Sequence, residues 1–391
     1  MRFLSYVLVA IVAFVAAIAI SNGDFGKSNE YDFSDMDGSS IEYEVPTEYT
    51  TYYNQLSTYQ KTIYDAIFDA VKNKKESLTF SSVDTVEFGN NCYAASLAVQ
   101  YDHPELFWFT GGYSYSESRT LFENRGEIVM YPTYYSYASS FFNEDSKGEE
   151  LSNAVKQVAD LARSYSSDTY DRIVFVHDYI IQNAIYDYDG LEEYYKSTRS
   201  PSCEYIFSAY GCLVNGKTVC SGYAKAFMLV MKELGVDCTY VVGDAGEKHG
   251  WNCVYLDGEG YYVDVTWDDL DRNTEVPKYD YALIDSKTLS KTHTVEFDCK
   301  GFEDPVCNSE KYNYFHYYGY YLDRYDYNEV SRILSEQSHK GYAYIRFGSM
   351  KEAEKAYEEL IKWSGYKKIP GLSGFSEQYV NDEFAVIGFI K

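Results

Sequence analysis

The sequence predicts an α+β protein with more than one domain. Apolar residues recur at three- and four-residue steps in several segments, as from Ile173 to Ala184, which is typical of helices packed on one face. Residues 248–269 instead have the pattern of two strands around an Asp257-Gly258-Glu259-Gly260 turn. A chain of 391 residues is long enough for two or three domains with sizeable cores. Helices combined with an antiparallel hairpin indicate the α+β class.

The first 21 residues predict an export segment. Arg2 supplies a short positive region, and Leu4–Ile20 is a run of 17 weakly polar to apolar residues. This length lies between that of a signal peptide and that of a membrane-spanning helix. Cleavage near Ala17-Ile18-Ala19 and an uncleaved membrane anchor therefore both stay open. In either case we expect the rest of the chain to be extracellular or on the cell surface.

The charge balance is strongly acidic, with 34 Lys and Arg against 60 Asp and Glu and a formal net charge of −26. Such a chain repels phosphate backbones, which argues against nucleic acid as a partner. Residues 340–347, KGYAYIRF, nevertheless fit a motif of RNA-recognition modules. Because the chain is acidic and predicted to be exported, we expect an aromatic strand before a helix here, with no nucleic acid bound.

The domain organisation follows from shifts in composition and pattern. Residues 22–49 hold eight acidic residues against one lysine and predict a flexible linker. A helical pattern that begins at Tyr52, followed by aromatic strand-like stretches, predicts a small α+β domain over 50–147. We expect the central domain over 148–295. The remaining residues, 296–391, predict a C-terminal α+β domain that contains a strand, a helix and a closing strand.

Eight cysteines have to be explained. They are Cys92, Cys203, Cys212, Cys220, Cys238, Cys253, Cys299 and Cys307. The absence of C-x-x-C spacing argues against a zinc ribbon or a thioredoxin-type site. If the chain is exported, disulfides Cys203–Cys212 and Cys299–Cys307 could each close a short loop. The other interpretation for most of them is a buried apolar thiol.

Cys220 stands at the start of a predicted amphipathic helix, residues 220–234. Tyr223, Phe227 and Leu234 belong to its apolar stripe, and Gly235 is a typical residue for ending a helix. A thiol attacks as thiolate, and the N-terminus of a helix favours negative charge. A structural cysteine that fills a helix end would give the same pattern, so the helix by itself does not identify a nucleophile.

The hairpin supplies the partners that such a nucleophile needs. If its loop has two residues, Leu256 pairs with Glu259 and Trp251 lies opposite Asp264. Asp264 then shares a face with His249 at about 7–8 Å between backbones, a gap that the two side chains can span. A three-residue loop would put Asp264 on the other face.

Cys220, His249 and Asp264 together predict a thiol triad of nucleophile, base and orienting acid. Taken singly, His249 could instead cap an aromatic sheet, and Asp264 could be a polar residue at a strand end. His177, which lies beside the apolar stripe of its helix, is interpreted as a structural histidine.

Three blocks of sequence resemble those of the transglutaminase-like superfamily, which has a papain-like core. They are TVCSGYAKAF, HGWNCVYL and YYVDVTWDD, and the resemblance extends over roughly 170–290. It implies a papain-like core with a helix packed on an antiparallel sheet, between two smaller α+β domains, in a member of the bacterial secreted type. It also assigns the catalytic roles to Cys220, His249 and Asp264.

The resemblance implies acyl transfer through a thioester on peptide or glutamine amides, as a protease or a transglutaminase. Hydrolysis is slightly favoured because water is the default acceptor. Candidates for an oxyanion-binding side chain are Asn215, Tyr210 and Tyr205. The expected partner is a protein or peptide substrate, and the oligomeric state stays open. The alternative is a catalytically silent surface protein that uses the same core for binding or adhesion.

We expect neither a cofactor nor a metal. Calcium activates animal transglutaminases, and Asp269, Asp271, Asn273 and Glu275 recur at alternate positions. Thr274 stands where an EF-hand loop needs glycine, so this segment is interpreted as a solvated acidic turn.

Overall fold

The computed structural model describes residues 29–32, 51–119, 125–140, 146–196, 201–269, 276–299 and 301–391. Contacts divide the chain into two compact units, Met1–Ala138 and Ser139–Lys391. The expected export segment and most of the expected linker lie outside the described residues. Within the described ranges, no helix combines the length and apolarity needed to cross a membrane. The three expected domain boundaries stay a prediction.

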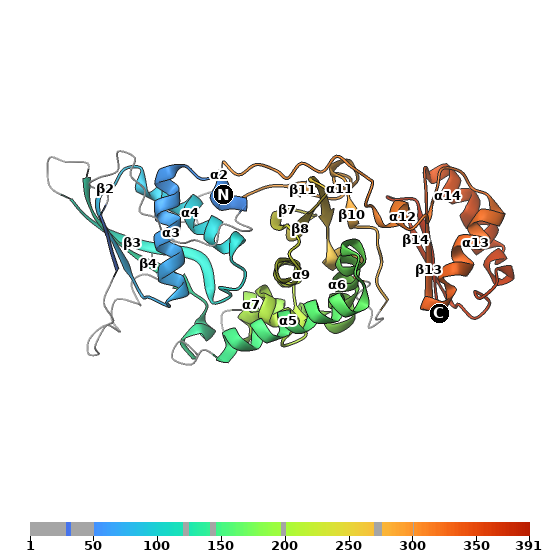
Figure 1. Ribbon diagram of the computed structural model, residues 1–391, viewed down its shortest axis with the longest axis horizontal. Coiled ribbons are helices and arrows are strands. Elements are labelled where there is room, and N and C mark those ends of the chain that lie inside the picture. Colours follow the sequence, from blue (N-terminus) through green and yellow to red (C-terminus); the bar gives the residue numbers. More distant parts are fainter. Residues whose placement is uncertain are drawn as a thin grey trace. The chain divides into compact units, whose positions relative to one another are not determined.

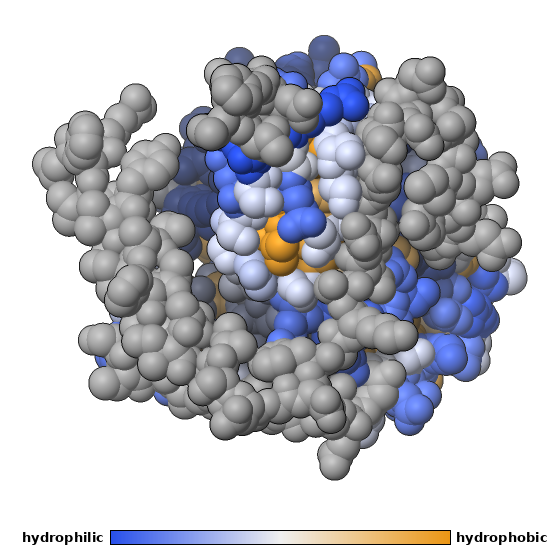
Figure 2. Space-filling view, turned by 90° about the vertical axis from the view of Figure 1, so that its left-hand side faces the viewer, coloured by the Kyte–Doolittle hydropathy of each residue, from blue (hydrophilic) through white to orange (hydrophobic). Residues whose placement is uncertain are grey.

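The first unit combines helices with a mixed four-stranded sheet of order β1-β2-β4-β3 (Figure 1). Its elements are β1 (Asn29–Asp32), α2 (Thr51–Gln55), α3 (Thr58–Lys72), β2 (Leu78–Asp84), α4 (Phe88–Asp102), β3 (Phe109–Arg119), β4 (Arg125–Tyr134) and the 3₁₀ helix η1 (Ser136–Ser140). Large side chains are exposed on the neighbouring strands β3 and β4, among them Tyr115 and Tyr131. Figure 2 shows a small apolar patch set among pale and hydrophilic residues on this side of the molecule.

The helical pattern predicted from Tyr52 is split into two helices. The Ser57 side chain accepts a hydrogen bond from Gln60 N at 3.3 Å, and Gln60 Oε1 accepts one from Ser57 N at 2.9 Å. This capping box starts a new helix at Thr58, because it satisfies backbone donors that have no partner within the helix. The apolar stripe is where the pattern predicts it, with Ile63 and Ile67 buried.

The second unit contains a helical layer and an antiparallel sheet of order β10-β9-β8-β7-β11. The helices are α5 (Ser146–Tyr165), α6 (Thr169–Asn183), α7 (Tyr188–Tyr195), η2 (Pro201–Phe207), α8 (Ala209–Leu213), α9 (Cys220–Leu234), α10 (Val265–Asp268) and α11 (Ser286–Leu289). The strands are β7 (Cys238–Asp244), β8 (Lys248–Leu256), β9 (Glu259–Val263), β10 (Ala282–Ile284) and β11 (Thr294–Val295), with a small pair β5 (Ile185–Tyr186) and β6 (Lys217–Thr218).

The helix α9 lies between these two layers. It packs against β7 and β8 on one side and against α5 and α6 on the other. The helix begins at Cys220 and ends before Gly235, whose φ of 75° places it in the left-handed region that favours glycine. The predicted α+β class, with a helix packed on an antiparallel sheet, is confirmed.

The β8–β9 hairpin has the register that a two-residue loop requires. Leu256 pairs with Glu259, and Asn252 pairs with Val263. Asp257 and Gly258 have φ values of 53° and 80°, as a tight turn of type I′ needs. The strand β9 then ends at Val263, and Asp264 follows directly at the start of α10. The geometry on which the predicted His–Asp pairing depended is therefore present.

The C-terminal part of the second unit has a sheet of order β12-β13-β15-β14 and a core of its own, which includes Val330, Ile345 and Ile387. Its elements are α12 (Tyr314–Tyr317), β12 (Tyr321–Leu322), α13 (Tyr327–Gln337), η3 (Ser338–Lys340), β13 (Tyr342–Phe347), α14 (Met350–Ala356), the π-helical turn η4 (Tyr357–Lys362), η5 (Gly365–Lys368), β14 (Glu377–Asn381) and β15 (Val386–Ile390).

The segment that fits the RNA-recognition motif forms the strand β13. Tyr344 is 1% exposed, and the Tyr342 hydroxyl lies 2.7 Å from that of Tyr279. Tyr279 in turn stacks on Tyr314 with ring centroids 3.6 Å apart. The aromatic rings of β13 are thus packed within the protein, which leaves Tyr344 no surface for stacking on a base.

All eight cysteines carry free thiols. Neither of the two disulfides considered from sequence, Cys203–Cys212 and Cys299–Cys307, is formed. The sulfur of Cys307 instead lies 3.5 Å from that of Cys253, and both residues are buried. Gly260 leaves room for this pair, because a Cβ at that position would come within 3.2 Å of both sulfurs.

Candidate active site

Cys220 is the first residue of α9, and its side chain is half-buried. The chain before it is held by Thr218, whose hydroxyl donates to Ile206 O at 2.8 Å. Gly222 permits this close approach, because a Cβ there would fall 1.7 Å from Thr218 Oγ1. The start of α9 is therefore fixed by packing. Its first N–H groups have no acceptor within the helix and favour negative charge near the Cys220 sulfur.

His249 and Asp264 lie in direct contact. His249 Nε2 is 2.7 Å from Asp264 Oδ2, and both side chains are buried. His249 comes from the start of β8 and Asp264 from the residue after β9, so the hairpin register brings them together. Cys220 is the third neighbour, because its interaction with the imidazole helps to raise the pKa of His249. Because Nε2 serves Asp264, Nδ1 is the atom left for the sulfur. All three predicted site residues are thus adjacent.

The charges of His249 and Asp264 stabilise each other. Burial alone lowers the pKa of His249, but the charge and hydrogen bond of Asp264, together with Cys220, raise it to about 10. Burial alone raises the pKa of Asp264, yet His249 and His293 bring it well below its ordinary value. An imidazolium beside an ionised carboxylate is therefore the stable form. Its positive charge lies next to Cys220 and would stabilise a thiolate there.

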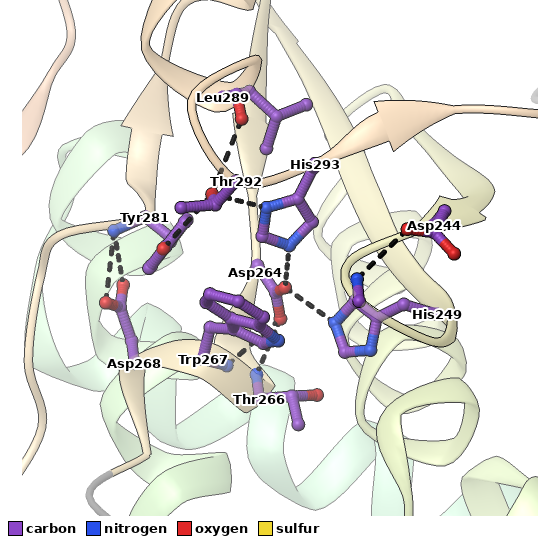
Figure 3. A network of polar contacts seen from close by, with 11 residues as sticks. Asp244, His249, Asp264, Thr266, Trp267, Asp268, Tyr281, Leu289, Thr292 and His293 are labelled. Atoms are coloured by element: carbon purple, nitrogen blue, oxygen red, sulfur yellow. Dashed lines mark hydrogen bonds and ion pairs between the residues drawn. The ribbon is translucent and has the colours of Figure 1, made fainter. Parts of the chain in front are cut away.

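The orientation of Asp264 is fixed by its place at the helix start. Its Oδ1 accepts hydrogen bonds from Thr266 N at 3.0 Å and Trp267 N at 3.1 Å, as the N-cap of α10. Figure 3 shows Oδ2 turned the other way, toward the imidazoles. One carboxylate oxygen therefore caps the helix and the other serves the site.

A second histidine contacts the same carboxylate, and sequence reasoning missed it. His293 Nε2 is 3.0 Å from Asp264 Oδ2, the oxygen that also faces His249 (Figure 3). His293 lies between α11 and β11, outside the three sequence blocks. Its contact with Asp264 depends on how the segments after β9 pack back against the sheet. No local pattern around Thr292-His293 signals that path.

The cluster does not have the dimensions of a metal site. The ligand atoms of His249, Asp264 and His293 lie within 4.8 Å of one another. The two nitrogens stand at hydrogen-bond distances from Oδ2, 2.7 and 3.0 Å. Atoms bound to a tetrahedral zinc at about 2.0–2.1 Å are spaced by roughly 3.3 Å. Hydrogen bonds from the two imidazoles to Asp264 Oδ2 explain these distances better than a metal ion shared by the three residues.

A lysine provides a second positive charge near the thiol. The sequence places Lys225 on the polar side of α9, but its ammonium group is half-buried and donates to Phe207 O at 3.1 Å. Burial lowers the pKa of Lys225 to about 8, and the charge of Cys220 acts in the opposite direction. The ammonium group thus interacts electrostatically with the sulfur, as the imidazolium does.

A pocket of about 190 Å³ opens beside the imidazole. Its lining residues are aromatic, acidic or hydroxyl-bearing, and they are Tyr186, Tyr188, Glu247, His249, Thr266, Trp267 and Asp269. Within the part of the chain that the structure describes, Thr266 Oγ1 has no hydrogen-bond partner. The pocket is large enough for a side chain, and it presents one hydroxyl without a partner and two carboxylates.

The expected oxyanion side chains are not placed at Cys220 by any contact. The Tyr210 hydroxyl donates to Glu150, and Tyr205 packs against Tyr210 with ring centroids 5.2 Å apart. Asn215 is exposed. The backbone N–H groups at the start of α9 are therefore the donors that the site offers. Of the expected acidic turn, Asp271, Asn273 and Glu275 lie outside the described residues, and Asp269 accepts a hydrogen bond from Tyr223.

One comparison with known proteins matches the central part of the chain. Residues 156–265 match the sequence model of the Transglutaminase-like superfamily. The kyphoscoliosis peptidase of Mus musculus is 29% identical over 123 residues, which are 28% of this chain and 17% of the mouse protein. The chain thus covers less than a fifth of that relative's length.

Solved structures are similar only at low scores. One is a TGase with 12% identity and a TM-score of 0.28, and the match covers 53% of this chain and 54% of the TGase. Another is described as a candidate cysteine protease from Cytophaga hutchinsonii, with 15% identity and a TM-score of 0.23, over 40% of this chain and 63% of the other. The family match over residues 156–265, together with the helix-on-sheet core, confirms the resemblance seen in the sequence: the chain contains a transglutaminase-like domain.

Proposed function

We propose that the chain is a cysteine-dependent acyl-transfer enzyme that acts on peptide or glutamine amides. The observation that carries the proposal is that His249 contacts Asp264 at 2.7 Å and also interacts with Cys220, which helps to raise the pKa of His249. A structural cysteine at a helix end needs no such partner. A thiol nucleophile, in contrast, requires a base that a carboxylate orients.

The geometry supports a two-step reaction. The Cys220 thiolate attacks the amide carbonyl, and the helix N-terminus stabilises the negative charge that develops on the oxygen. His249 then gives its proton to the departing amine, which leaves a thioester on Cys220. Asp264 keeps the imidazole in the orientation that both transfers need. In the second step the acceptor attacks the thioester while His249 takes its proton, which releases Cys220 as a thiolate and restores the imidazolium.

The acceptor in the second step is water or an amine. We take hydrolysis as the leading reaction, because water needs no dedicated site. The pocket nevertheless supports an amine as a second candidate, since Glu247 and Asp269 line it together with the Trp267 ring. Carboxylates and aromatic faces both attract a protonated amine. The same features would also hold a basic side chain of a peptide substrate.

Labelling with a thiol reagent tests the first requirement of the proposal, that Cys220 is a reactive nucleophile. We expect iodoacetamide at neutral pH to modify Cys220 faster than the buried cysteines and faster than a free thiol peptide. His249→Ala should reduce that rate to the level of the peptide. Cys238→Ala is the matched control, since Cys238 is a buried cysteine on the neighbouring strand β7. An unreactive Cys220, or a rate that ignores His249→Ala, would support the silent binding protein instead.

A second assay separates the two acceptors. The purified protein is incubated with a glutamine-containing peptide and a fluorescent primary amine. Dye on the peptide shows amine transfer, whereas released ammonia or a cut backbone without dye shows hydrolysis. Cys220→Ala must abolish whichever product forms.

The acidic chain and its apolar first residues also support export, which we include in the proposal. A tagged protein in the native host should be recovered outside the cytoplasm, either released or attached to the membrane. The N-terminal sequence of the recovered protein tells cleavage near Ala17-Ile18-Ala19 from an uncleaved anchor. Recovery from the cytoplasm alone would refute export without affecting the enzyme assignment.

A further inference from the structure

We infer that His293 is a positioning residue for the triad, because it holds the Asp264 carboxylate in line with His249. This inference rests on the proposed function. Its starting point is that one carboxylate oxygen contacts two imidazoles, His249 at 2.7 Å and His293 at 3.0 Å. A histidine buried only for packing would have no reason to meet the oxygen that serves the catalytic base.

The hydrogen bonds define which nitrogen of His293 carries the proton. His293 Nδ1 lies 2.8 Å from Thr292 Oγ1, a hydroxyl that also accepts a hydrogen bond from Tyr281 at 3.2 Å. The alternative acceptor for the Thr292 proton, Leu289 O, is farther away at 3.4 Å. Thr292 therefore donates to Nδ1, and the ring proton is on Nε2. Nε2 faces Asp264 Oδ2 (Figure 3), so its proton is donated to that oxygen.

His293 completes the set of donors around Asp264. Oδ1 accepts from two backbone N–H groups, and Oδ2 accepts from His249 and His293. The hydrogen bond from His249 Nε2 to Oδ2 changes in strength during catalysis, because the charge of the imidazole changes. The bond from His293 stays constant. It fixes the direction of Oδ2 while His249 exchanges protons with Cys220.

The surroundings leave no substitute for this donor. The side chain of His293 is 0% exposed, and the rings of Trp267 and Trp251 lie with centroids 4.6 and 5.1 Å from it. The titratable groups that face it are Asp264, His249 and Tyr281. Water therefore has no ready access to this position and cannot replace the Nε2–H as a donor. Without His293, Asp264 Oδ2 would lose one of its hydrogen bonds.

Two substitutions separate the donor from the ring. His293→Phe keeps a ring between the tryptophans but removes the N–H, whereas His293→Gln carries an amide N–H to about the position of Nε2. We expect His293→Phe to slow iodoacetamide labelling of Cys220 about 10-fold at neutral pH, since a hydrogen bond to a charged group is lost. We expect His293→Gln to stay within about 3-fold of the native protein.

The pH profile of labelling is the readout that a packing role would not move. If Asp264 is less well aligned, the imidazolium is less stable and the thiolate forms less readily. The acidic limb of the profile should then move up by about one pH unit in His293→Phe, which corresponds to the 10-fold loss of rate. His316→Phe, the same replacement in α12, is the matched control and should leave rate and profile unchanged.

The outcomes distinguish this inference from the proposed function. If His249→Ala suppresses labelling but a folded His293→Phe shows native rate and profile, only the role of His293 is refuted. A limb that moves to lower pH in His293→Phe also refutes it, as does a His293→Gln variant with native melting temperature but the rate of His293→Phe. If labelling does not depend on His249 at all, the proposed function itself fails.

Discussion

Two buried histidines in the second unit, His249 and His177, contact carboxylates from the same short helix. His249 contacts Asp264, the N-cap of α10, and His177 Nε2 lies 3.2 Å from Asp268, its last residue. His177 Nδ1 also lies 2.9 Å from Asp178. Burial lowers the pKa of His177, but hydrogen bonds to the two carboxylates raise it to about 9. By charge and burial, the two imidazoles are nearly equivalent.

The difference is what each imidazole has on its other side. His249 faces a thiol and lines a pocket, whereas His177 stacks on Tyr279, with ring centroids 5.6 Å apart. Tyr279 donates to Asp178 at 2.8 Å and also contacts Tyr342 on β13. A raised pKa and an acidic partner therefore do not identify a catalytic histidine here. What distinguishes His249, and supports its proposed role, is the neighbouring Cys220 and the pocket that it lines.

The sharpest test of this contrast removes the charge of Asp264 in one variant and that of Asp268 in another. Asp264→Asn should reduce Cys220-dependent turnover by about 10³–10⁴-fold, because the imidazole loses its orientation and the stabilisation of its charge. Asp268→Asn should leave turnover within about 2-fold and instead destabilise the protein by about 2–4 kcal/mol, since buried His177 loses an ionised partner. Steady-state kinetics and urea unfolding on both variants measure the two effects. A similar loss of turnover in both would remove the distinction between the networks.

The histidine of the second network should matter for stability only. His177→Phe leaves Asp268 buried at 0% exposure without its imidazole, which should cost about 3–5 kcal/mol in the free energy of unfolding. Iodoacetamide labelling of Cys220 below the melting temperature should keep its native rate. Slower labelling in a folded His177→Phe protein would mean that this network also acts on the site.

The pH dependence of stability gives the next effect. The folded pKa of His177 is about 9, above the ordinary value of 6.5, so the folded state binds a proton more tightly than the unfolded chain. The stabilisation is complete below about pH 6.5 and is lost as the pH rises through 9. The difference in unfolding free energy between the native protein and His177→Phe should therefore shrink by about 3 kcal/mol over this range. A difference that grows with pH would contradict the ion pairs of His177.

The same comparison shows what a sequence can predict. The His249–Asp264 contact follows from a two-residue turn at Asp257-Gly258 and from period-two alternation, both of which are local features. His293 reaches Asp264 only after α10, β10 and α11 have been placed, so its role depends on tertiary packing. His177 lies beside an apolar stripe, and its structural role stays a prediction; its two carboxylates do not follow from the sequence.

Lys225 shows what such patterns leave open. It lies opposite the apolar stripe of α9, yet it donates to Phe207 O and interacts with the Cys220 charge. The sequence does not show that η2 covers this side of α9, because that contact joins segments whose packing is decided by the whole core. The periodicity of apolar residues therefore predicts which helices and strands form, whereas long-range packing decides which of their polar residues become buried.

The smallest effect concerns the hydroxyl that links the His177 network to the C-terminal sheet. Tyr342→Phe removes the donor to Tyr279, while Tyr279 keeps its own bond to Asp178. We expect a loss of about 0.5–1.5 kcal/mol in the free energy of unfolding, the usual contribution of one hydrogen bond, with unchanged labelling of Cys220. Tyr325→Phe, which removes an exposed hydroxyl bonded to Glu359, is the matched control and should cost less. If Tyr342→Phe altered the reactivity of Cys220, the C-terminal sheet would be coupled to the catalytic residues, and the separation between the two histidine networks would no longer hold.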